Sequence, residues 1–509
     1  MMTDSSSQLE ESGSLAFLGR SAVLNVLFAT EAVASFLLDV VIAAAFGLSV
    51  RSDALYAAYA LPQKVGRGMF QSLTNSFMGL FAGEADRQQA YREAITVIAV
   101  LAAPISAVLS LTAAWWLPVT IPGASAETRA AAVPLAAVLA WLLAFLALAE
   151  TFRAIYYHEG VQWLPTLTRV AGAALSIAVV LVSPSEQRLT LAAWGLTLGA
   201  ALEAIVGLAL MRAVLKVRYV PAWPSAARLR TTLAMVGVPL AGQGVNVGAT
   251  LGEQALASLL PPGSITAANY ARRIINTLER FVFRGFLITT IRRSAERRRT
   301  DVRSDFRQIM LVAIPVAVIM AALPVPLTAV VFGRGQFGSG DVLTLALALQ
   351  TFAPAVLATA ATRIPSGLAY AERRLRLLFT SAVLSSAVLL VSEAVLIWAG
   401  LGLRALGLSS ALANTVSFAW LYATLLRPGR VRVADRRGGF QLAMAGAGAW
   451  LGTVALQALV RGAMGSHAPN LALLAGGTLG CGVFLVATAY VLGLHEVRRL
   501  VGALRGGAR

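Results

Sequence analysis

Runs of about twenty apolar residues recur along the whole chain, the first near residues 22–47 and the last near 470–494. A helix of that length crosses the hydrocarbon core of a bilayer. The runs are continuous, whereas the strands of a membrane β-barrel alternate apolar and polar residues. Of the 509 residues, 58% are hydrophobic and 13% are charged, against about 25% charged residues in soluble proteins. The sequence therefore predicts an all-α polytopic membrane protein.

The apolar runs divide into fourteen predicted spans. They cover residues 22–47, 54–82, 94–118, 131–156, 164–183, 189–211, 231–259, 265–291, 309–332, 342–370, 376–400, 405–426, 440–461 and 470–494. The connections are short, which leaves no sizeable soluble domain. We predict five segments: a cytoplasmic N-terminal segment (1–20), an N-lobe of spans 1–6 (21–215), a cytoplasmic linker (216–230), a C-lobe of spans 7–12 (231–427), and spans 13–14 with a cytoplasmic tail (428–509). The first thirteen residues lack the basic start of a signal peptide, so we expect the first span to be retained.

The distribution of basic residues predicts the orientation. Of the 42 lysines and arginines, 27 lie in the termini and in the loops after the even-numbered spans, and only 6 lie in the opposite loops. Basic loops stay on the cytoplasmic side of a membrane. We therefore expect both termini in the cytoplasm, and we interpret the net charge of +18 as topogenic, with no nucleic-acid partner.

The sequence offers little catalytic chemistry. Cys481 is the only cysteine, which excludes an internal disulfide and a cysteine-based metal site. The three histidines lie near span ends, so we expect no metal site. Neither lysine stands in a phosphate-binding loop of the Gly-x-x-x-x-Gly-Lys-Ser/Thr type. We predict a protein that is not an enzyme and that holds no cofactor, with its energy supplied by an ion, by the membrane potential or by the cargo gradient.

The most unusual span is Ile265–Arg293, because it carries four arginines in its interior: Arg272, Arg273, Arg280 and Arg284. Each ionisable group at membrane depth costs about 2.5–3.5 kcal/mol on insertion scales, so such groups normally face a cavity or a partner. Three of the four fall on one face of a helix, at positions 273, 280 and 284. Guanidinium groups bind phosphate with paired donors. The stripe therefore predicts a polar cavity that receives an anionic cargo.

Other polar groups in the membrane concentrate in spans 1, 2 and 7. Span 1 holds Glu31 and Asp39, and span 2 holds Lys64 and Arg67 beside Pro62, which favours a bent helix. We predict that spans 1, 2, 7 and 8 line the cavity. The alternative is a set of internal salt bridges that only hold helices together. Three further groups, Glu150, Arg153 and Glu203, are interpreted as structural or close to the interface.

Short motifs along the chain resemble those of the MurJ/MviN lipid II flippase family, within the MATE-like exporter superfamily. At the start they are Phe46-Gly47-Leu48-Ser49, Ser52-Asp53-Ala54, Leu61-Pro62 and Arg67; further on come Gly263-Ser264 with Tyr270-Ala271-Arg272-Arg273, then Pro326-Leu327-Thr328, Phe332, Gly335, Phe337, Asp341, Pro365, Gly367, Tyr370 and Ala371, and finally Leu408-Ser409, Asn414 and Leu421-Tyr422. The resemblance implies a two-lobed bundle of fourteen helices with a central cationic cavity. It also implies a flippase of the bacterial inner membrane that moves an undecaprenyl-pyrophosphate-linked sugar to the periplasmic leaflet by alternating access.

The resemblance assigns roles residue by residue. It places the substrate arginine of span 8 on Arg273, the aspartate of span 1 on Asp39 and an arginine of span 2 on Arg67. It also shows departures: two span 1 arginines of the family fall on Ala32 and Leu38, and an aspartate of span 8 is replaced by Arg272. The predicted substrate-binding set is Arg273, Arg67, Asp39, Arg272, Arg280, Arg284, Lys64 and Glu31. The departures leave open whether the cargo is lipid II or another lipid-linked glycan, such as an exopolysaccharide unit.

Two carboxylates, Glu253 of span 7 and Glu393 of span 11, are candidates for a coupling ion, either H⁺ or Na⁺. The alternative is two unrelated, satisfied carboxylates. Competing functions are a drug or small-molecule exporter of the same superfamily, a membrane-embedded glycan polymerase or ligase, and a scaffold without transport. A basic cavity disfavours cationic drugs, and the short outer loops disfavour an enzyme. The expected partners are membrane lipid and a polyprenyl-pyrophosphate-linked glycan.

Overall fold

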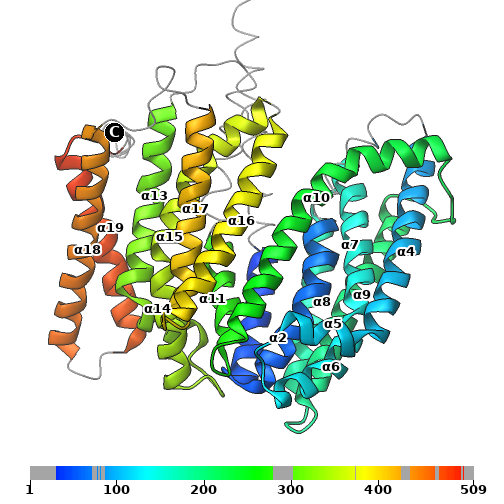
Figure 1. The fold of residues 1–509 in the computed structure, drawn as a ribbon, viewed down its shortest axis with the longest axis horizontal. Helices are drawn as coiled ribbons and strands as arrows, with labels where there is room; N and C mark the ends of the chain where they lie inside the picture. The colour runs from blue at the N-terminus through cyan, green and yellow to red at the C-terminus, as the bar shows by residue number, and fades with distance from the viewer. Residues whose placement is uncertain are drawn as a thin grey trace, which may run out of the picture. The chain divides into compact units, whose positions relative to one another are not determined.

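The protein is described by a computed structural model that covers residues 30–70, 77, 81, 86–278, 302–372, 374–425, 436–464, 469–494 and 497. Within these residues every regular element is a helix (Figure 1). Nine stretches of the described chain are long and apolar enough to cross a membrane. The protein is therefore an all-α multi-pass membrane protein.

Each of the fourteen predicted spans overlaps a described helix or pair of helices, and residues 22–29, most of 71–82 and 279–291 of these spans lie outside the described residues. The second predicted span changes from an α-helix (α2, Val50–Gln63) to a π-helix (η1, Lys64–Met69) two residues after Pro62. The number fourteen stays a prediction, since the nine clear stretches do not by themselves establish it.

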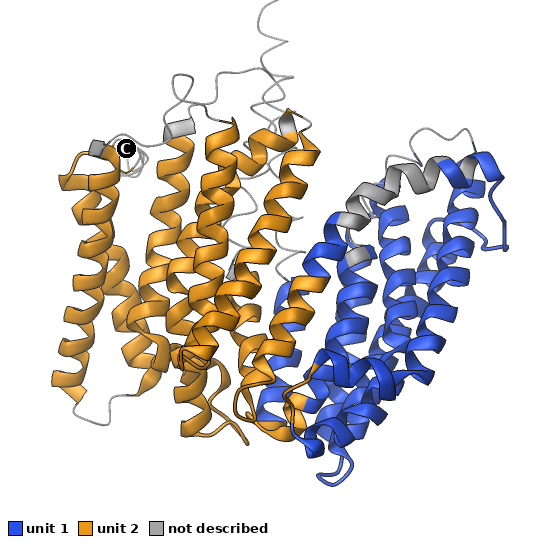
Figure 2. Cartoon of the chain, viewed as in Figure 1, with its two compact units in different colours: residues 1–45, 54–120, 125–247 blue, residues 46–53, 121–124, 248–509 orange. Residues whose placement is uncertain are grey.

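The chain forms two compact units (Figure 2). Unit 1 comprises Met1–Ala45, Ala54–Thr120 and Ser125–Val247, and unit 2 comprises Phe46–Asp53, Ile121–Ala124 and Gly248–Arg509. The boundary between them at Val247 falls inside the long helix α10 (Ala226–Ala257).

Unit 1 is built from the helix over residues 30–46 and from the elements that follow it. These are α2, η1, α4 (Arg87–Leu111), α5 (Ala113–Thr120), α6 (Ala126–Leu139), α7 (Trp141–His158), α8 (Leu164–Val182), α9 (Arg188–Val214) and the first part of α10. Local signals set several starts: the Asp86 side chain accepts a hydrogen bond from the backbone N–H of Gln89 at the start of α4, and Ser125 accepts one from Thr128 at the start of α6.

Helices α8 and α9 pack closely because small residues face one another. A Cβ added to Gly172 would lie 2.5 Å from the carbonyl oxygen of Gly199, and the hydroxyl of Ser176 donates to the carbonyls of both Gly172 and Gly195. Membrane helices use small residues and hydroxyl groups in this way, since lipid provides no hydrophobic drive for their association. This contact fixes α8 beside α9, and both helices supply charged side chains to the interior of unit 1.

Unit 2 contains the end of α10 and the remaining helices. They are α11 (Ser264–Leu278), α13 (Val302–Ala322), α14 (Pro324–Phe332), α15 (Ser339–Ala371), α16 (Leu375–Trp398), α17 (Arg404–Leu425), α18 (Arg436–Met464) and α19 (Asn470–Val491). Helix α17 contacts both α15 and α16. At Gly407 an added Cβ would lie 2.3 Å from the backbone carbon of Thr351, so the approach of α17 to α15 requires glycine.

Residues Phe46–Asp53 pack with unit 2 and explain one of the sequence motifs. The buried carboxylate of Asp53 accepts hydrogen bonds from the backbone N–H groups of Gly263 and Thr266, at 2.6 and 2.8 Å, and from the hydroxyl of Thr266 at 2.7 Å. These donors lie at the start of α11, where backbone N–H groups have no partner within the helix. Asp53 thus holds the start of the arginine-bearing helix in place.

Candidate functional site

The described part of the arginine stripe lies on α11 and consists of Arg272 and Arg273, both partly buried. Arg280 and Arg284 lie outside the described residues. The guanidinium group of Arg272 forms an ion pair with the carboxylate of Glu253 on α10. It also lies 3.5 Å from the Ser410 hydroxyl and 5.9 Å from the ring centre of Phe352 on α15. Arg272 is therefore held inside unit 2 by contacts to three other helices.

Glu393 of α16 lies in the same neighbourhood. A Cβ added to Gly252, the residue before Glu253, would lie 2.6 Å from the side chain of Leu390, which is about one helical turn from Glu393. The exposed fraction of Glu393 is 0%. Among the described residues, neither of its two oxygens accepts a hydrogen bond. The nearby hydroxyl of Ser409 donates instead to the backbone carbonyl of Leu406, at 3.0 Å. The two carboxylates that the sequence singled out, Glu253 and Glu393, are thus brought together around one arginine.

Unit 1 holds a second set of buried charges. Three glutamates and three arginines from five elements form a connected network, here called the unit 1 network: Glu31, Arg67, Glu150, Arg153, Arg169 and Glu203. At its centre, Arg169 of α8 reaches Glu31 at 2.7 Å, Glu150 of α7 at 2.8 Å and Glu203 of α9 at 3.6 Å. The six groups sum to zero charge.

Two predicted substrate residues belong to this network. Glu31 accepts hydrogen bonds from Arg169, Arg153 and the Thr166 hydroxyl. Arg67 lies in the π-helix and contacts Glu203 at 2.5 Å and Glu150 at 3.7 Å. Its side chain is 22% exposed, whereas the other five members are almost completely buried. Arg67 therefore lies at the edge of the network and is the member most accessible to a ligand, while Glu31 is enclosed.

The remaining predicted residues of unit 1 lie nearby in the chain. Lys64 is the first residue of the π-helix and is partly buried. The buried Asp39 accepts a hydrogen bond from the hydroxyl of Tyr56, at 3.2 Å. π-helical segments that interrupt α-helices are frequently found at functional sites. A Cβ added to Gly66, within the same segment, would lie 2.9 Å from the Cα of Leu143, so this turn presses directly on α7.

The sequence interpretation missed Arg169. It anticipated internal salt bridges and interpreted Glu150, Arg153 and Glu203 as structural, but it did not single out the residue that joins them. An arginine in the predicted span 164–183 was the available signal, because an intramembrane arginine requires partners. Whether Arg67 and Glu31 contact cargo stays a prediction.

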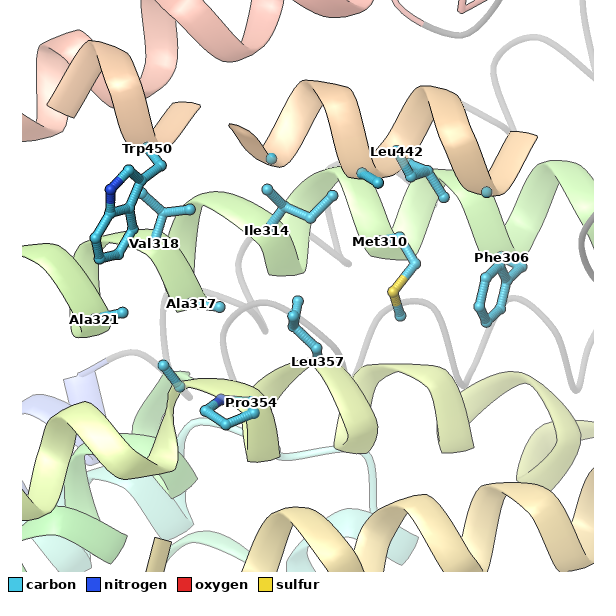
Figure 3. A pocket seen from close by; sticks show the side chains of 14 residues that line it. Phe306, Met310, Ile314, Ala317, Val318, Ala321, Pro354, Leu357, Leu442 and Trp450 are labelled. Carbon is cyan, nitrogen blue, oxygen red and sulfur yellow. The ribbon is translucent and has the colours of Figure 1, made fainter. Parts of the chain in front are cut away.

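Unit 2 also contains an apolar groove between α13, α15 and α18 (Figure 3). Its volume is about 610 Å³. All the lining residues are aliphatic, aromatic, methionine, proline or glycine; they are Phe306, Met310, Ile314, Ala317, Val318, Ala321, Ala353, Pro354, Leu357, Gly439, Leu442, Ala443, Gly446 and Trp450. Such a groove accepts a hydrocarbon chain and offers no partner for a charged group.

Solved structures with a similar fold are membrane exporters. A structure described as lipid II flippase MurJ in an inward closed conformation matches with a TM-score of 0.78 at 14% identity, and the match covers 94% of this chain and all of that one. An inward-facing multidrug resistance MATE family transporter of the MOP superfamily matches with a TM-score of 0.63 at 15% identity, over 77% of this chain and 95% of that one. The fold is thus that of MATE-like exporters.

The sequence assigns the family within that class. The family model of the lipid II flippase MurJ matches residues 42–470. A curated relative, the probable lipid II flippase MurJ of Bdellovibrio bacteriovorus, is 28% identical over 341 residues, which is 60% of each chain. The chain belongs to the MurJ family, as its motifs indicated. Members of this family are transporters, and the match to the curated relative spans about three fifths of that protein's length.

Proposed function

We propose that this protein is a flippase that moves a polyprenyl-pyrophosphate-linked glycan, either lipid II or a related cell-envelope precursor, from the cytoplasmic to the periplasmic leaflet. The observation that carries the proposal is the match to the MurJ family model over residues 42–470. The curated relative, named a probable lipid II flippase, supports the same substrate class.

Two features of unit 2 fit the two chemical parts of such a cargo. Arginine forks bind pyrophosphate oxygens bidentately, and Arg273 is a partly buried arginine of α11. The apolar groove between α13, α15 and α18 suits a polyprenyl chain, because its lining is wholly hydrocarbon apart from a methionine sulfur and the indole nitrogen of Trp450. A lipid with an anionic head needs both kinds of surface.

Arg67 is the candidate for a second contact to the pyrophosphate. It is the one partly exposed member of the unit 1 network, and it pairs with Glu203. A pyrophosphate would compete with that carboxylate for the guanidinium group. The predicted set further includes Asp39, Lys64, Arg280 and Arg284, as positions whose charge shapes the cavity. We propose alternating access as the mechanism, with both termini in the cytoplasm.

The proposal is tested by complementation. A strain depleted of its lipid II flippase and a strain lacking an exopolysaccharide flippase receive the wild-type gene, R273A, R273K or R67A. Growth of the first strain supports lipid II, and rescue of only the second supports another glycan. We expect R273A and R67A to abolish rescue while the protein still accumulates. The matched control is R376A, which removes an exposed arginine at the start of α16. Near-normal rescue by both R273A and R67A would contradict the cavity assignment.

A second candidate is a small-molecule exporter, which the structural similarity to a multidrug MATE transporter favours. Arg273 argues against cationic drugs, because it places positive charge at membrane depth. Efflux that raises drug resistance in an efflux-deficient host, without rescue of either glycan mutant, would rank this candidate first.

The orientation is tested by labelling. Cys481, the only cysteine of the chain, is buried and is replaced by serine to give a cysteine-free background. Single cysteines are then placed at Ala222 in the linker and at Ser185 in the loop between α8 and α9. We expect a membrane-impermeant maleimide added to intact cells to label position 185 and not position 222. The opposite pattern would reverse the proposed topology.

A further inference from the structure

The cluster of Glu253, Arg272 and Glu393, here called the unit 2 cluster, carries an unbalanced charge. One guanidinium group faces two carboxylates, so the three groups sum to −1 when all are ionised. Arginine keeps its proton in proteins, so it cannot correct this balance by losing or gaining one. A buried charge that is neither paired nor hydrogen-bonded is costly. The cluster therefore requires one further positive charge.

The missing charge belongs at Glu393. The carboxylate of Glu253 is paired directly with Arg272. Glu393 is fully enclosed, and among the described residues its two oxygens receive no hydrogen bond. The other charged groups on the helices around it are Arg273 of α11, Asp341 and Arg363 of α15 and Arg404 of α17. Among the described residues, Arg272 is the group whose charge acts on Glu393. Its surroundings are the guanidinium group and the hydroxyl groups of α17.

The surroundings favour a proton over a metal ion. A sodium ion needs several oxygen ligands, but the Ser409 hydroxyl donates to Leu406 and the Ser410 hydroxyl lies against Arg272. A metal ion shared by both carboxylates would also have to displace the guanidinium group of Arg272 from the carboxylate of Glu253. Within the described residues there is no group of three or more histidine, cysteine, aspartate or glutamate side chains that could hold a metal. A proton needs none of these ligands, since it bonds to one carboxylate oxygen and removes its charge.

We infer that the unit 2 cluster binds one proton, which Glu393 carries. The guanidinium group of Arg272 takes the place of a bound cation beside Glu253, so the two carboxylates do not bind Na⁺ together. The replacement of an acidic residue by Arg272, which the family resemblance pointed out, thus converts a pair of carboxylates into a site for a single proton. The use of this proton in transport rests on the proposed function, whereas its binding does not.

The test measures the proton directly on the purified full-length protein. Infrared difference spectra between acidic and alkaline buffer report the carbonyl stretch of a protonated carboxyl group. We expect one such band from a buried group in the wild type, its loss in E393Q and a shift in its frequency in E393D. The E393D variant guards against a general loss of structure, because a shifted band requires a folded site. Identical bands in the wild type, E393Q and E393D would overturn the inference.

A second carboxyl group must be separated from Glu393 in this experiment. Burial raises the pKa of Asp53 from 3.8 to about 6. Between these values the folded protein holds a proton at Asp53 that the unfolded chain has lost, so the stability that this group contributes falls as the pH rises from 3.8 to 6. All variants are therefore made in a D53N background as well as in the wild type, so that the remaining band is that of Glu393.

Two further measurements distinguish the ion and the function. The melting temperature is compared in sodium chloride and choline chloride at equal concentration; we expect no difference in the wild type, and a sodium-specific rise that E393Q abolishes would overturn the inference. Lipid flipping is then measured in proteoliposomes. If the wild type moves no lipid while E393Q still removes the infrared band, the proposed function fails and the proton site stands.

Discussion

The unit 1 network and the unit 2 cluster are both buried in a membrane protein, yet their charge balance differs. The unit 1 network contains three arginines and three glutamates, and each guanidinium group contacts at least two carboxylates. The unit 2 cluster contains one arginine and two glutamates, and within the described part of the chain the carboxylate of Glu393 receives no hydrogen bond. The comparison teaches that buried charge alone does not mark a binding site. A buried charge without an opposite charge beside it does mark one, because the fold has not compensated for that charge.

The largest loss of stability is expected when Arg169, at the centre of the charge-balanced unit 1 network, is replaced. Replacement of Arg169 by methionine leaves three carboxylates facing two arginines. Removal of one partner from a buried ion pair typically destabilises a protein by about 3–5 kcal/mol. We expect R169M to lower the melting temperature strongly and to reduce accumulation in the membrane. The double variant R169M/E31Q should recover part of the loss, since it restores the charge balance; no recovery would contradict the role of balance.

The second prediction compares the loss of stability when one glutamate of each cluster, Glu203 or Glu393, is replaced by glutamine. Glutamine keeps the shape of the side chain but removes its charge. E203Q should destabilise by about 1.5–3 kcal/mol, because Arg67 and Arg169 lose a charged acceptor. E393Q should have no destabilising effect, because it mimics the protonated carboxyl group. Thermal unfolding at neutral pH measures both. Equal destabilisation by the two variants would remove the distinction between a structural and an ion-binding cluster.

The third prediction concerns a variant that lacks the guanidinium group of Arg272. In R272M, Glu253 and Glu393 face one another without the guanidinium group. We expect this variant to gain a melting temperature that rises with sodium chloride and not with choline chloride. Sodium at about a hundred times its dissociation constant would stabilise the folded state by about 2.7 kcal/mol. Equal melting curves in the two salts would show that Arg272 is not what excludes sodium.

The smallest effect is expected at the surface. Arg374 pairs with Glu372 at 2.8 Å, and both side chains are about half exposed. Water screens such a pair, and exposed pairs typically contribute about 0–1 kcal/mol. We expect R374A to change the melting temperature little and to leave rescue in the complementation assay unchanged. A loss comparable to that of R169M would mean that burial does not explain the effect at Arg169.

Much of the fold could be predicted from the sequence because hydropathy acts locally. In a bilayer each span must satisfy its own backbone hydrogen bonds, so every apolar run becomes a helix whatever its neighbours are. The predicted ranges accordingly overlap described helices. The family motifs could also be recognised in the sequence. Two of them contact one another in the structure, where the backbone N–H of Gly263 donates a hydrogen bond to the carboxylate of Asp53 at the start of α11.

The partners of the buried charges could not be predicted in the same way. Glu31 and Arg169 are 138 residues apart in the chain, and only the packing of separate helices brings them to 2.7 Å. The sequence grouped Glu31 with the cargo site as a charge of span 1, and Arg67 through the family resemblance, and it showed the partners of neither. In the structure both groups contact opposite charges of unit 1.

The sequence by itself determined that this chain is a multi-pass helical membrane protein of the MurJ family with arginines at membrane depth, because apolar length, charge position and short motifs are written in consecutive residues. Only the tertiary structure decided which charges cancel. Ion pairing depends on distances between helices far apart in the chain, and these distances leave the unit 1 network neutral and the unit 2 cluster one positive charge short.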